Sequence, residues 1–228
     1  MKKRYTTYGM TSQADFQIRD VESGQQKSRF DIYHHGKKLG TINLNLPGIH
    51  NVYNATASIA VGVELNIAFD QIKSALETVE GVQRRLEIKG ESNGVTVIDD
   101  YGHHPTEIKV TLETLEENWQ NRRKVVVFQP HRYSRTRALF DEFSRAFYQS
   151  DVLVVLPIYA ASEKKIEGVT SQHLCEEIKA HGHKEVIHAD GFKDALSHLR
   201  QILKPGDVLL TLGAGDVYRV GEDILRKF

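Results

Sequence analysis

The chain has 228 residues, of which 40% are apolar and 26% are charged, and its 30 Lys and Arg residues balance its 30 Asp and Glu residues. This composition is typical of a soluble globular protein, and the lack of a basic excess argues against a nucleic-acid or anionic-membrane partner. The single Cys175 excludes an intrachain disulfide and fits a reducing compartment. No apolar run approaches the roughly 18–20 residues that span a bilayer, and no apolar core of a secretory signal follows the basic N-terminus. These features predict a cytoplasmic protein.

The first part of the chain predicts strands followed by two helices. Partial alternation of apolar and polar residues, divided by Gly-containing turns, indicates strands, with a hairpin turn in "HHGKK". Apolar residues then recur at helical spacing, and Asp70 is a candidate N-cap of the second helix. The expected strands cover residues 14–22, 28–36 and 37–48, and the expected helices cover 50–66 and 68–82.

A charged, Gly-marked stretch over residues 81–94 predicts a hinge, so we place a domain boundary there. After it, short β-branched runs alternate with helical patterns, which favours an α/β fold with a Rossmann-like, doubly wound, mostly parallel sheet. The expected strands are residues 95–99, 124–130, 151–158, 185–189 and 207–215, and the expected helices are 105–118, 134–149, 171–182, 191–203 and a final C-terminal one.

In such sheets, ligands bind at the carboxyl ends of the strands. Four polar loops fall there: "DDYGHHP", "QPHRYSR", "PIYAASE" and "LGAGD". The last is a weak match to a dinucleotide fingerprint, because its spacing is not G-x-G-x-x-G. Tight packing between a strand and a helix explains it better.

The loop after the first of these strands contains an acid doublet, Asp99 and Asp100. Two adjacent carboxylates repel each other unless a cation, a ribose hydroxyl or an arginine compensates them. Pro105 suits the first helical position and Glu107 suits the first turn, so both have structural explanations. The candidate binding residues that remain in this loop are Asp99, Asp100, Tyr101, His103 and His104, although a solvated loop is the alternative.

The next loop places His131, Arg132 and Arg135 at the start of a helix. Arginine provides a planar pair of donors that suits a carboxylate or a phosphate. Positive charge at a helix N-terminus opposes the helix dipole, so we expect an anion to compensate it; a solvated basic helix start is the alternative.

Other polar and reactive residues are less specific. Asn51 and Asn54, preceded by His50, lie on a first helical turn, where one Asn could cap the helix or both amides could read the edge of a base. Cys175 lies on an amphipathic helix and reads as a core residue. The scattered histidines lack a spacing that predicts a metal site.

Five motifs, in this order, resemble those of the ATP-dependent Mur ligases of peptidoglycan synthesis: "GIHNVYNATASIAV", "GVQRRLE", "IDDYGHHPTEI", "FQPHRYSRT" and "LGAGDVYRV". The resemblance covers essentially the whole chain. Family members have three domains, and their phosphate loop lies early in the central one, but no such loop occurs in this sequence. The resemblance implies that residues 1–85 are the C-terminal portion of the central ATPase domain and that residues 86–228 are the C-terminal Rossmann-like ligase domain.

The resemblance also implies roles for individual residues. His50, Asn51 and Asn54 would contact the adenine of ATP, and Asp100 would lie on the ribose side. Arg85 would belong to the phosphate or interdomain region. Tyr101, His103, His131, Arg132 and Arg135 would surround an amino-acid substrate, and Arg85 and His103 would be catalytic. The implied reaction joins L-alanine to UDP-N-acetylmuramate through an acyl phosphate, with ATP and Mg²⁺. The magnesium ligands are expected in the missing part of the central domain.

Three alternatives remain open at this level. One is the related ligase that attaches a whole tripeptide to UDP-N-acetylmuramate, another is a non-catalytic nucleotide-binding α/β module, and the third is a structural domain with solvated strand ends. Without a phosphate loop, we expect this chain alone to be inactive as a ligase. The sequence does not determine the oligomeric state.

Overall fold

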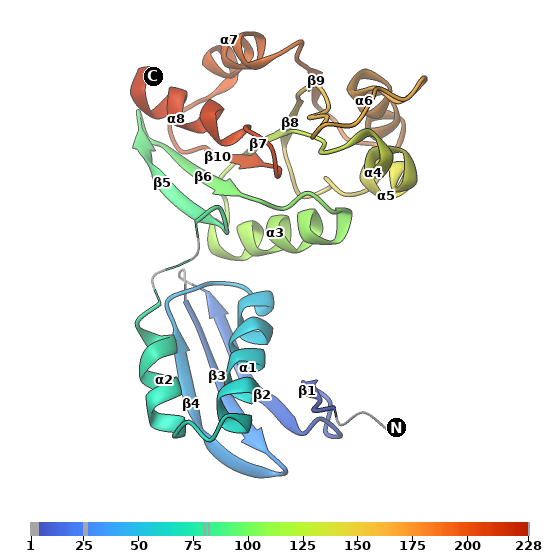
Figure 1. Ribbon diagram of the computed structural model, residues 1–228. Coiled ribbons are helices and arrows are strands. Elements are labelled where there is room, and N and C mark those ends of the chain that lie inside the picture. Colours follow the sequence, from blue (N-terminus) through green and yellow to red (C-terminus); the bar gives the residue numbers. More distant parts are fainter. Residues whose placement is uncertain (1–4, 25–26, 80, 82, 228) are drawn as a thin grey trace. The chain divides into compact units, whose positions relative to one another are not determined.

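The computed structural model describes residues 5–24, 27–79, 81 and 83–227, and the chain forms two compact units that divide after Gly81 (Figure 1). This division lies four residues before the boundary predicted after Arg85. Arg84, which the predicted boundary left in the first domain, donates to Asp99 of the second unit. Within the described ranges, no helix combines the length and apolar character that a membrane crossing requires.

The first unit is a four-stranded sheet with two helices on one face (Figure 1). The strands lie in the order β1 (Tyr8–Gly9), β2 (Phe16–Gly24), β3 (Lys27–His34) and β4 (Lys37–Leu44). The short β1 pairs parallel to β2, and the other pairs are antiparallel. The predicted hairpin is confirmed, because β3 and β4 are joined by the two residues His35 and Gly36, both at positive φ.

Helices α1 (Ile49–Glu64) and α2 (Phe69–Glu77) pack their apolar stripes on the inner side chains of the sheet. The predicted N-cap at Asp70 is wrong: Ala68 occupies the cap and Asp70 lies in the first turn. A carboxylate in that turn still complements the helix dipole, which accounts for the signal in the sequence.

The second unit contains a six-stranded sheet in the order β5-β6-β10-β7-β8-β9. The strands are β5 (Glu87–Ser92), β6 (Val95–Asp100), β7 (Lys124–Phe128), β8 (Val152–Val155), β9 (Val186–His188) and β10 (Val208–Leu212). Only the edge pair of β5 and β6 is antiparallel among the pairings of this described sheet. The mostly parallel sheet is therefore confirmed.

Alternate residues of the central strands face two separate cores, so helices cover both faces of the sheet (Figure 1). Helices α3 (Pro105–Asn118), α5 (Phe140–Ser144) and α6 (Ser171–Ala180) contribute to one core, and α7 (Phe192–Ile202) and α8 (Tyr218–Lys227) contribute to the other. This arrangement is the predicted doubly wound fold. Cys175 of α6 is 3% exposed in the first core, and burial raises the pKa of its thiol to about 12.

Two segments differ from the prediction. Part of the expected hinge at 81–94 is the edge strand β5, whose charged side chains are exposed or half-buried. The single helix expected over 134–149 is two short ones, α4 (Tyr133–Ala138) and α5, divided at Leu139. The chain leaves the helical path after α5, where the Phe147 carbonyl accepts from the backbone and hydroxyl of Ser150 in a turn.

Candidate active site

Three central strands of the second unit end in register. Leu212, at the end of β10, pairs with Asp100 on one side and with Phe128 on the other. The backbone N–H of Gly213 then donates to the carbonyl of Asp100 (3.1 Å), and that of Gln129 donates to the carbonyl of Leu212 (3.0 Å). The loops that follow β6, β7 and β10 therefore leave the sheet side by side, which is where doubly wound proteins bind ligands.

The two acids of the first loop are buried and bonded within the protein. Asp99, 1% exposed, accepts from Nε of Arg84 (2.9 Å) and from the hydroxyl of Thr211 (2.6 Å). Asp100 accepts from the backbone N–H groups of Leu86 (2.9 Å) and Gly102 (2.7 Å), and also from Thr111. Burial raises the pKa of both carboxyls, although these donors favour the charged forms. Of the three compensating groups expected for this acid pair, the structure shows an arginine: Arg84 pairs with Asp99.

Arg84 connects three segments of the site and was not singled out from the sequence. Besides its bond to Asp99, its guanidinium donates to the carbonyls of Gly213 (2.6 Å) and Gly215 (3.0 Å). It also lies over the rings of Tyr101 and Tyr218, 5.0 and 4.9 Å from their centroids. Arg84 thus fixes the segment that enters this unit to the ends of β6 and β10.

Helix α3 begins as the sequence predicted. Pro105 occupies the first turn, and Glu107 accepts from the backbone N–H groups of His103 (3.0 Å) and His104 (3.1 Å). The ring of His104 accepts from the N–H of Thr106 (3.2 Å), so this histidine is the N-cap. A capping role explains His104 without a ligand.

Four rings line the exposed side of the loops. The Tyr101 and His103 rings meet edge to face with centroids 5.4 Å apart, and the His103 and His131 rings lie 5.8 Å apart. His131 in turn stacks on Tyr159, at 5.4 Å and 9°. Tyr159 comes from the loop after β8, and its backbone pairs with Pro130 and Arg132. The structure therefore brings the predicted Tyr101, His103 and His131 together.

Arg135 approaches the outer edge of this row of rings. Its guanidinium lies 3.3 Å from Nδ1 of His131, and because a guanidinium only donates, Nδ1 is the acceptor and the ring is neutral. Burial lowers the pKa of His131, and the nearby charges of Arg135, His103 and Arg132 lower it further. The site thus combines a neutral imidazole with cationic side chains.

Arg132 is the exposed N-cap of α4 and adopts φ 73°, so α4 begins one residue after it. The anion expected at this helix start is present within the chain: the Glu163 carboxylate accepts from the backbone N–H (2.9 Å) and the hydroxyl (2.6 Å) of Ser134. These bonds lower the pKa of Glu163. Glu163 compensates the helix N-terminus, while Arg132 and Arg135 remain beside His131.

Arg85 is about half exposed, lies 4.0 Å from Glu107 and approaches the ring of Tyr101 (5.7 Å to its centroid). The glycine turn after β10 is closely packed, which agrees with the tight strand-to-helix packing predicted for "LGAGD". A Cβ at Gly215 would stand 2.3 Å from Oε1 of Gln129, whose amide also donates to Asp216 (3.1 Å).

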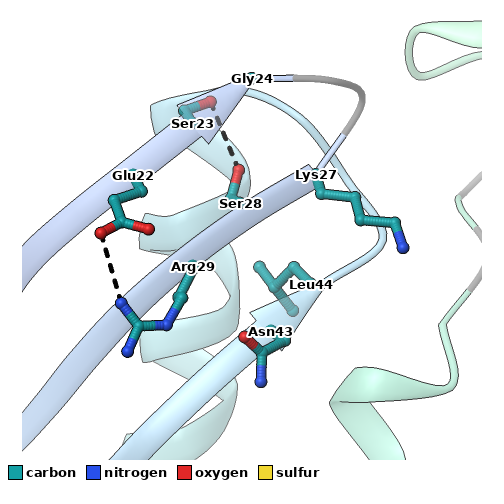
Figure 2. A pocket seen from close by; sticks show the side chains of 8 residues that line it. All are labelled: Glu22, Ser23, Gly24, Lys27, Ser28, Arg29, Asn43 and Leu44. Carbon is teal, nitrogen blue, oxygen red and sulfur yellow. Dashed lines mark hydrogen bonds and ion pairs between the residues drawn. The ribbon is translucent and has the colours of Figure 1, made fainter.

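His50, Asn51 and Asn54 belong to the first unit and lie on the first turns of α1. Gly48, at φ 92°, is the N-cap, so neither asparagine caps the helix. The Asn51 amide donates to the carbonyl of Pro47 (2.7 Å), and Asn54 is exposed. A groove at the ends of β2, β3 and β4 also lies in this unit (Figure 2), but Glu22 and Arg29 pair with each other there at 3.4 Å.

A magnesium ion would need oxygen ligands that are not already engaged. The acids nearest the site do not fit this role, because Asp99 is bound to Arg84 and Thr211 and Asp100 holds two backbone N–H groups. In the described part of the chain, no group of three or more His, Cys, Asp and Glu residues is arranged to hold a metal ion.

Comparisons with known proteins assign both parts of the chain to Mur ligase domains. Residues 84–215 match the family model described as "Mur ligase, glutamate ligase domain", and residues 1–62 match that of the Mur ligase middle domain. A relative from Desulfosudis oleivorans, named UDP-N-acetylmuramate–L-alanine ligase, is 60% identical over 225 residues, which are 99% of this chain and 49% of the relative. The chain thus spans about half the length of the curated relatives it matches.

Solved structures share the fold. The crystal structure of UDP-N-acetylmuramate-alanine ligase from Thermotoga maritima has a TM-score of 0.79 at 28% identity and covers 97% of this chain and 47% of its own. The MurF ligase of the same organism, in complex with ADP, has a TM-score of 0.68 at 19% identity and covers 96% of this chain and 48% of its own. With one family model matching more than half of its residues, this chain belongs to the Mur ligase family.

Proposed function

We propose that this chain is part of an ATP-dependent ligase that joins L-alanine to UDP-N-acetylmuramate. Its 60% identity to a relative of that name supports the substrate assignment, and the ADP complex of the MurF ligase supports a nucleotide in the reaction. The observation that carries the proposal is the pairing of Arg135 with a neutral His131, beside His103 and Tyr101, at the carboxyl ends of the central strands.

The proposed reaction has two steps. ATP transfers its γ-phosphoryl group to the lactyl carboxylate of UDP-N-acetylmuramate, which gives an acyl phosphate and ADP. The neutral amine of L-alanine then attacks the acyl carbon, and the tetrahedral intermediate collapses to an amide, releasing phosphate and the amine proton. Binding both reactants in one closed site would supply much of the rate.

Within this chain, the arginines would hold the negatively charged groups. Arg135 and Arg132 would bind the alanine carboxylate, since both lie next to His131 and a guanidinium suits a carboxylate. His131, Tyr101 and His103 would line the amino-acid pocket, and His103 would guide the amine. The partly exposed Arg85 would stabilise charge on the transferring phosphoryl group.

The nucleotide contacts are proposed for both units. His50, Asn51 and Asn54 would bind adenine, and the loop held by Asp100 would approach the ribose. Mg²⁺ would neutralise phosphate charge when bound, with ligands outside this chain. We further propose that residues 1–85 are the end of the central ATPase domain and residues 86–228 the C-terminal ligase domain, and that the enzyme acts in the cytoplasm, where ATP is available.

The test is a reconstitution with the half of the Desulfosudis oleivorans relative that this chain does not span. We expect phosphate release from ATP that depends on both UDP-N-acetylmuramate and L-alanine, and none from this chain alone. Arg135→Ala should raise the KM for L-alanine at least about tenfold, because a charge-assisted carboxylate contact is worth about 1.5–3 kcal/mol. Arg137→Ala removes the same charge from an exposed position on α4 and should change the KM little.

The same assay discriminates between substrates. Turnover with a tripeptide in place of L-alanine would reassign the reaction to the recycling ligase. Calorimetric binding of an ATP analogue to the reconstituted protein, with no turnover for either acceptor, would indicate a non-catalytic nucleotide-binding module.

A further inference from the structure

Gln129 is a buried side chain of the candidate active site to which no role has yet been given. It follows β7 directly, its backbone N–H pairs with the end of β10, and the residue is 6% exposed. Its side-chain Nε2 donates to the carboxylate of Asp216 (3.1 Å). Because a carboxylate accepts, this bond determines which end of the amide is the nitrogen, and the oxygen atom Oε1 faces elsewhere.

Oε1 of Gln129 is an acceptor without a donor. The protein encloses this atom, yet none of the described residues donates to it. Over the described residues of the second unit, it is the one buried side-chain nitrogen or oxygen in this condition. A buried carbonyl that has lost its hydrogen bonds to water destabilises the fold. Such an atom is suited to a donor that arrives with a bound molecule.

The neighbouring acceptors, by contrast, have donors within the chain. The carbonyls of Gly213 and Gly215 accept from the guanidinium of Arg84. The buried carboxylate of Asp99 accepts from the same guanidinium (2.9 Å). The unpaired oxygen is therefore particular to Gln129 and is not a general property of the loops that surround it.

Gln129 lies next to the row of rings. A Cβ built on Gly215 would stand 2.3 Å from Oε1 and 3.0 Å from the ring of Tyr159, so both groups crowd the same side of this glycine. The Tyr159 ring stacks on His131, whose Nδ1 lies 3.3 Å from the guanidinium of Arg135. These side chains thus follow one another, with a guanidinium at one end and the Gln129 oxygen at the other.

The two ends of this series complement the two polar ends of an amino acid. Arg135 only donates, which suits a carboxylate, and Oε1 only accepts, which suits an amino group. We infer that Oε1 of Gln129 accepts a hydrogen bond from the α-amino group of the amino-acid substrate. The inference rests on the proposed function and adds to it the residue that recognises the amine, while His103 keeps the role proposed above.

Tyr159 controls access to this oxygen. Its backbone is held at both ends, since its N–H donates to Pro130 (2.8 Å) and its carbonyl accepts from Arg132 (2.8 Å). The ring itself is 40% exposed, so it can turn about its side-chain bonds while the backbone stays in place. When the amino acid binds, the ring moves away from Gly215 and the amine reaches Oε1.

The experiment compares L-alanine with propionate, which is alanine without its amino group. Calorimetry measures the binding of each to this chain reconstituted with the half of the Desulfosudis oleivorans relative that it does not span, together with UDP-N-acetylmuramate and an ATP analogue that cannot transfer phosphate. We expect L-alanine to bind at least about tenfold more tightly than propionate, because a site with a buried polar group rejects a ligand that lacks its partner.

Three variants separate the amine from the carboxylate. Gln129→Met keeps the length of the side chain and removes the amide, so it should weaken L-alanine binding at least about tenfold and leave propionate binding unchanged. Arg135→Ala should weaken the binding of both ligands, because both carry the carboxylate. Gln172→Met is the matched control: Gln172 is exposed on α6, and its loss should preserve the preference of the parent protein.

Thermal unfolding of this chain distinguishes a ligand contact from a structural role. Gln129→Met removes a buried acceptor that has no donor, so the variant should unfold at the same temperature as the parent chain or at a higher one. A variant that unfolds at a lower temperature and binds both ligands weakly would assign Gln129 a structural role and overturn the inference.

Two further results would overturn it while the proposed ligase activity stands. They are equal binding of L-alanine and propionate by the parent protein, and an unchanged preference for L-alanine in Gln129→Met. A parent protein that binds neither ligand would refute the proposed function, and this inference with it.

Discussion

Arg84 donates to one buried carboxylate and to two backbone carbonyls, so a single side chain satisfies acceptors from two strand ends. The Asp99 that it pairs with is almost fully buried, and an ionised carboxylate without a partner is costly there. We therefore regard Arg84 as the main structural contact between the entering segment and the site.

Replacing Arg84 by Met should lower the free energy of unfolding by about 3 kcal/mol, because it leaves Asp99 charged and buried without its cation. Urea denaturation would measure the loss. Arg85→Met is the control: Arg85 is 46% exposed and 4.0 Å from Glu107, so its loss should cost below about 1 kcal/mol. Equal effects of the two substitutions would contradict this role for Arg84.

His183 makes stability depend on pH. Its Nδ1 accepts from the backbone N–H of Glu185 (3.2 Å), its Nε2 lies 2.9 Å from the hydroxyl of Ser150, and burial lowers its pKa. A proton on Nδ1 would meet a donor, so the folded protein resists protonation. As pH falls below about 6.5, the unfolded chain binds a proton that the folded chain excludes, and stability decreases by about 1.4 kcal/mol per unit of pKa difference.

His183→Gln should therefore give a shallower loss of stability between pH 7.5 and the lowered pKa than the parent protein does. Urea unfolding at several pH values measures both slopes. The pKa values of His34 and His131 are lowered in the same direction, so the variant should retain part of the dependence. An unchanged slope would show that His183 does not contribute.

The elements that the sequence predicted well are those in which local signals and burial agree. Helix α3 carries Pro105 in its first turn and the Glu107 capping contact, so its start and end could be predicted. The strands β6, β7 and β10 are wholly buried, and most of their residues are apolar. Because parallel strands carry their loops to one edge, the grouping of Tyr101, His103 and His131 was also predictable.

Other features depend on distant contacts. Strand β5 is charged and contains Gly90, so its composition resembles a loop until it pairs with β6. The 134–149 segment has a helical pattern, but it divides at Leu139, whose side chain packs against the core that α3 and α6 share. Arg84 and Arg85 differ in role because only the guanidinium of Arg84 bonds Asp99. The sequence of two adjacent arginines does not indicate which of them faces that carboxylate.

The turn after β10 tolerates little added volume. Gly215→Ala would place a methyl group 2.3 Å from Gln129 and 3.0 Å from the ring of Tyr159, and should cost about 1–3 kcal/mol through overpacking. Gly191→Ala is the control, because a Cβ there meets nothing within 4 Å; its effect should remain within about 0.5 kcal/mol. Thermal unfolding would compare the two, and equal stability would contradict the close packing.

The two units have separate apolar cores, because one cluster lies wholly before Gly81 and the others wholly after it. A fragment of residues 82–228 should therefore fold alone with a single cooperative transition, measured by circular dichroism and near-ultraviolet signals. A fragment of residues 87–228 loses Arg84 and the Leu86 N–H that bonds Asp100, and should unfold at least about 3 kcal/mol more easily. Indistinguishable fragments would exclude a role for this segment in the fold.

Cys175, the one cysteine in the sequence, lies on the buried side of α6, and burial raises the pKa of its thiol to about 12. A thiol that is both covered and protonated does not react with maleimides at neutral pH. The rate at which Cys175 is alkylated would therefore report how often α6 separates from the sheet, which is a measure of local opening of the second unit. A cysteine introduced at an exposed position of the chain would then accept a fluorophore selectively, with the native thiol left in place.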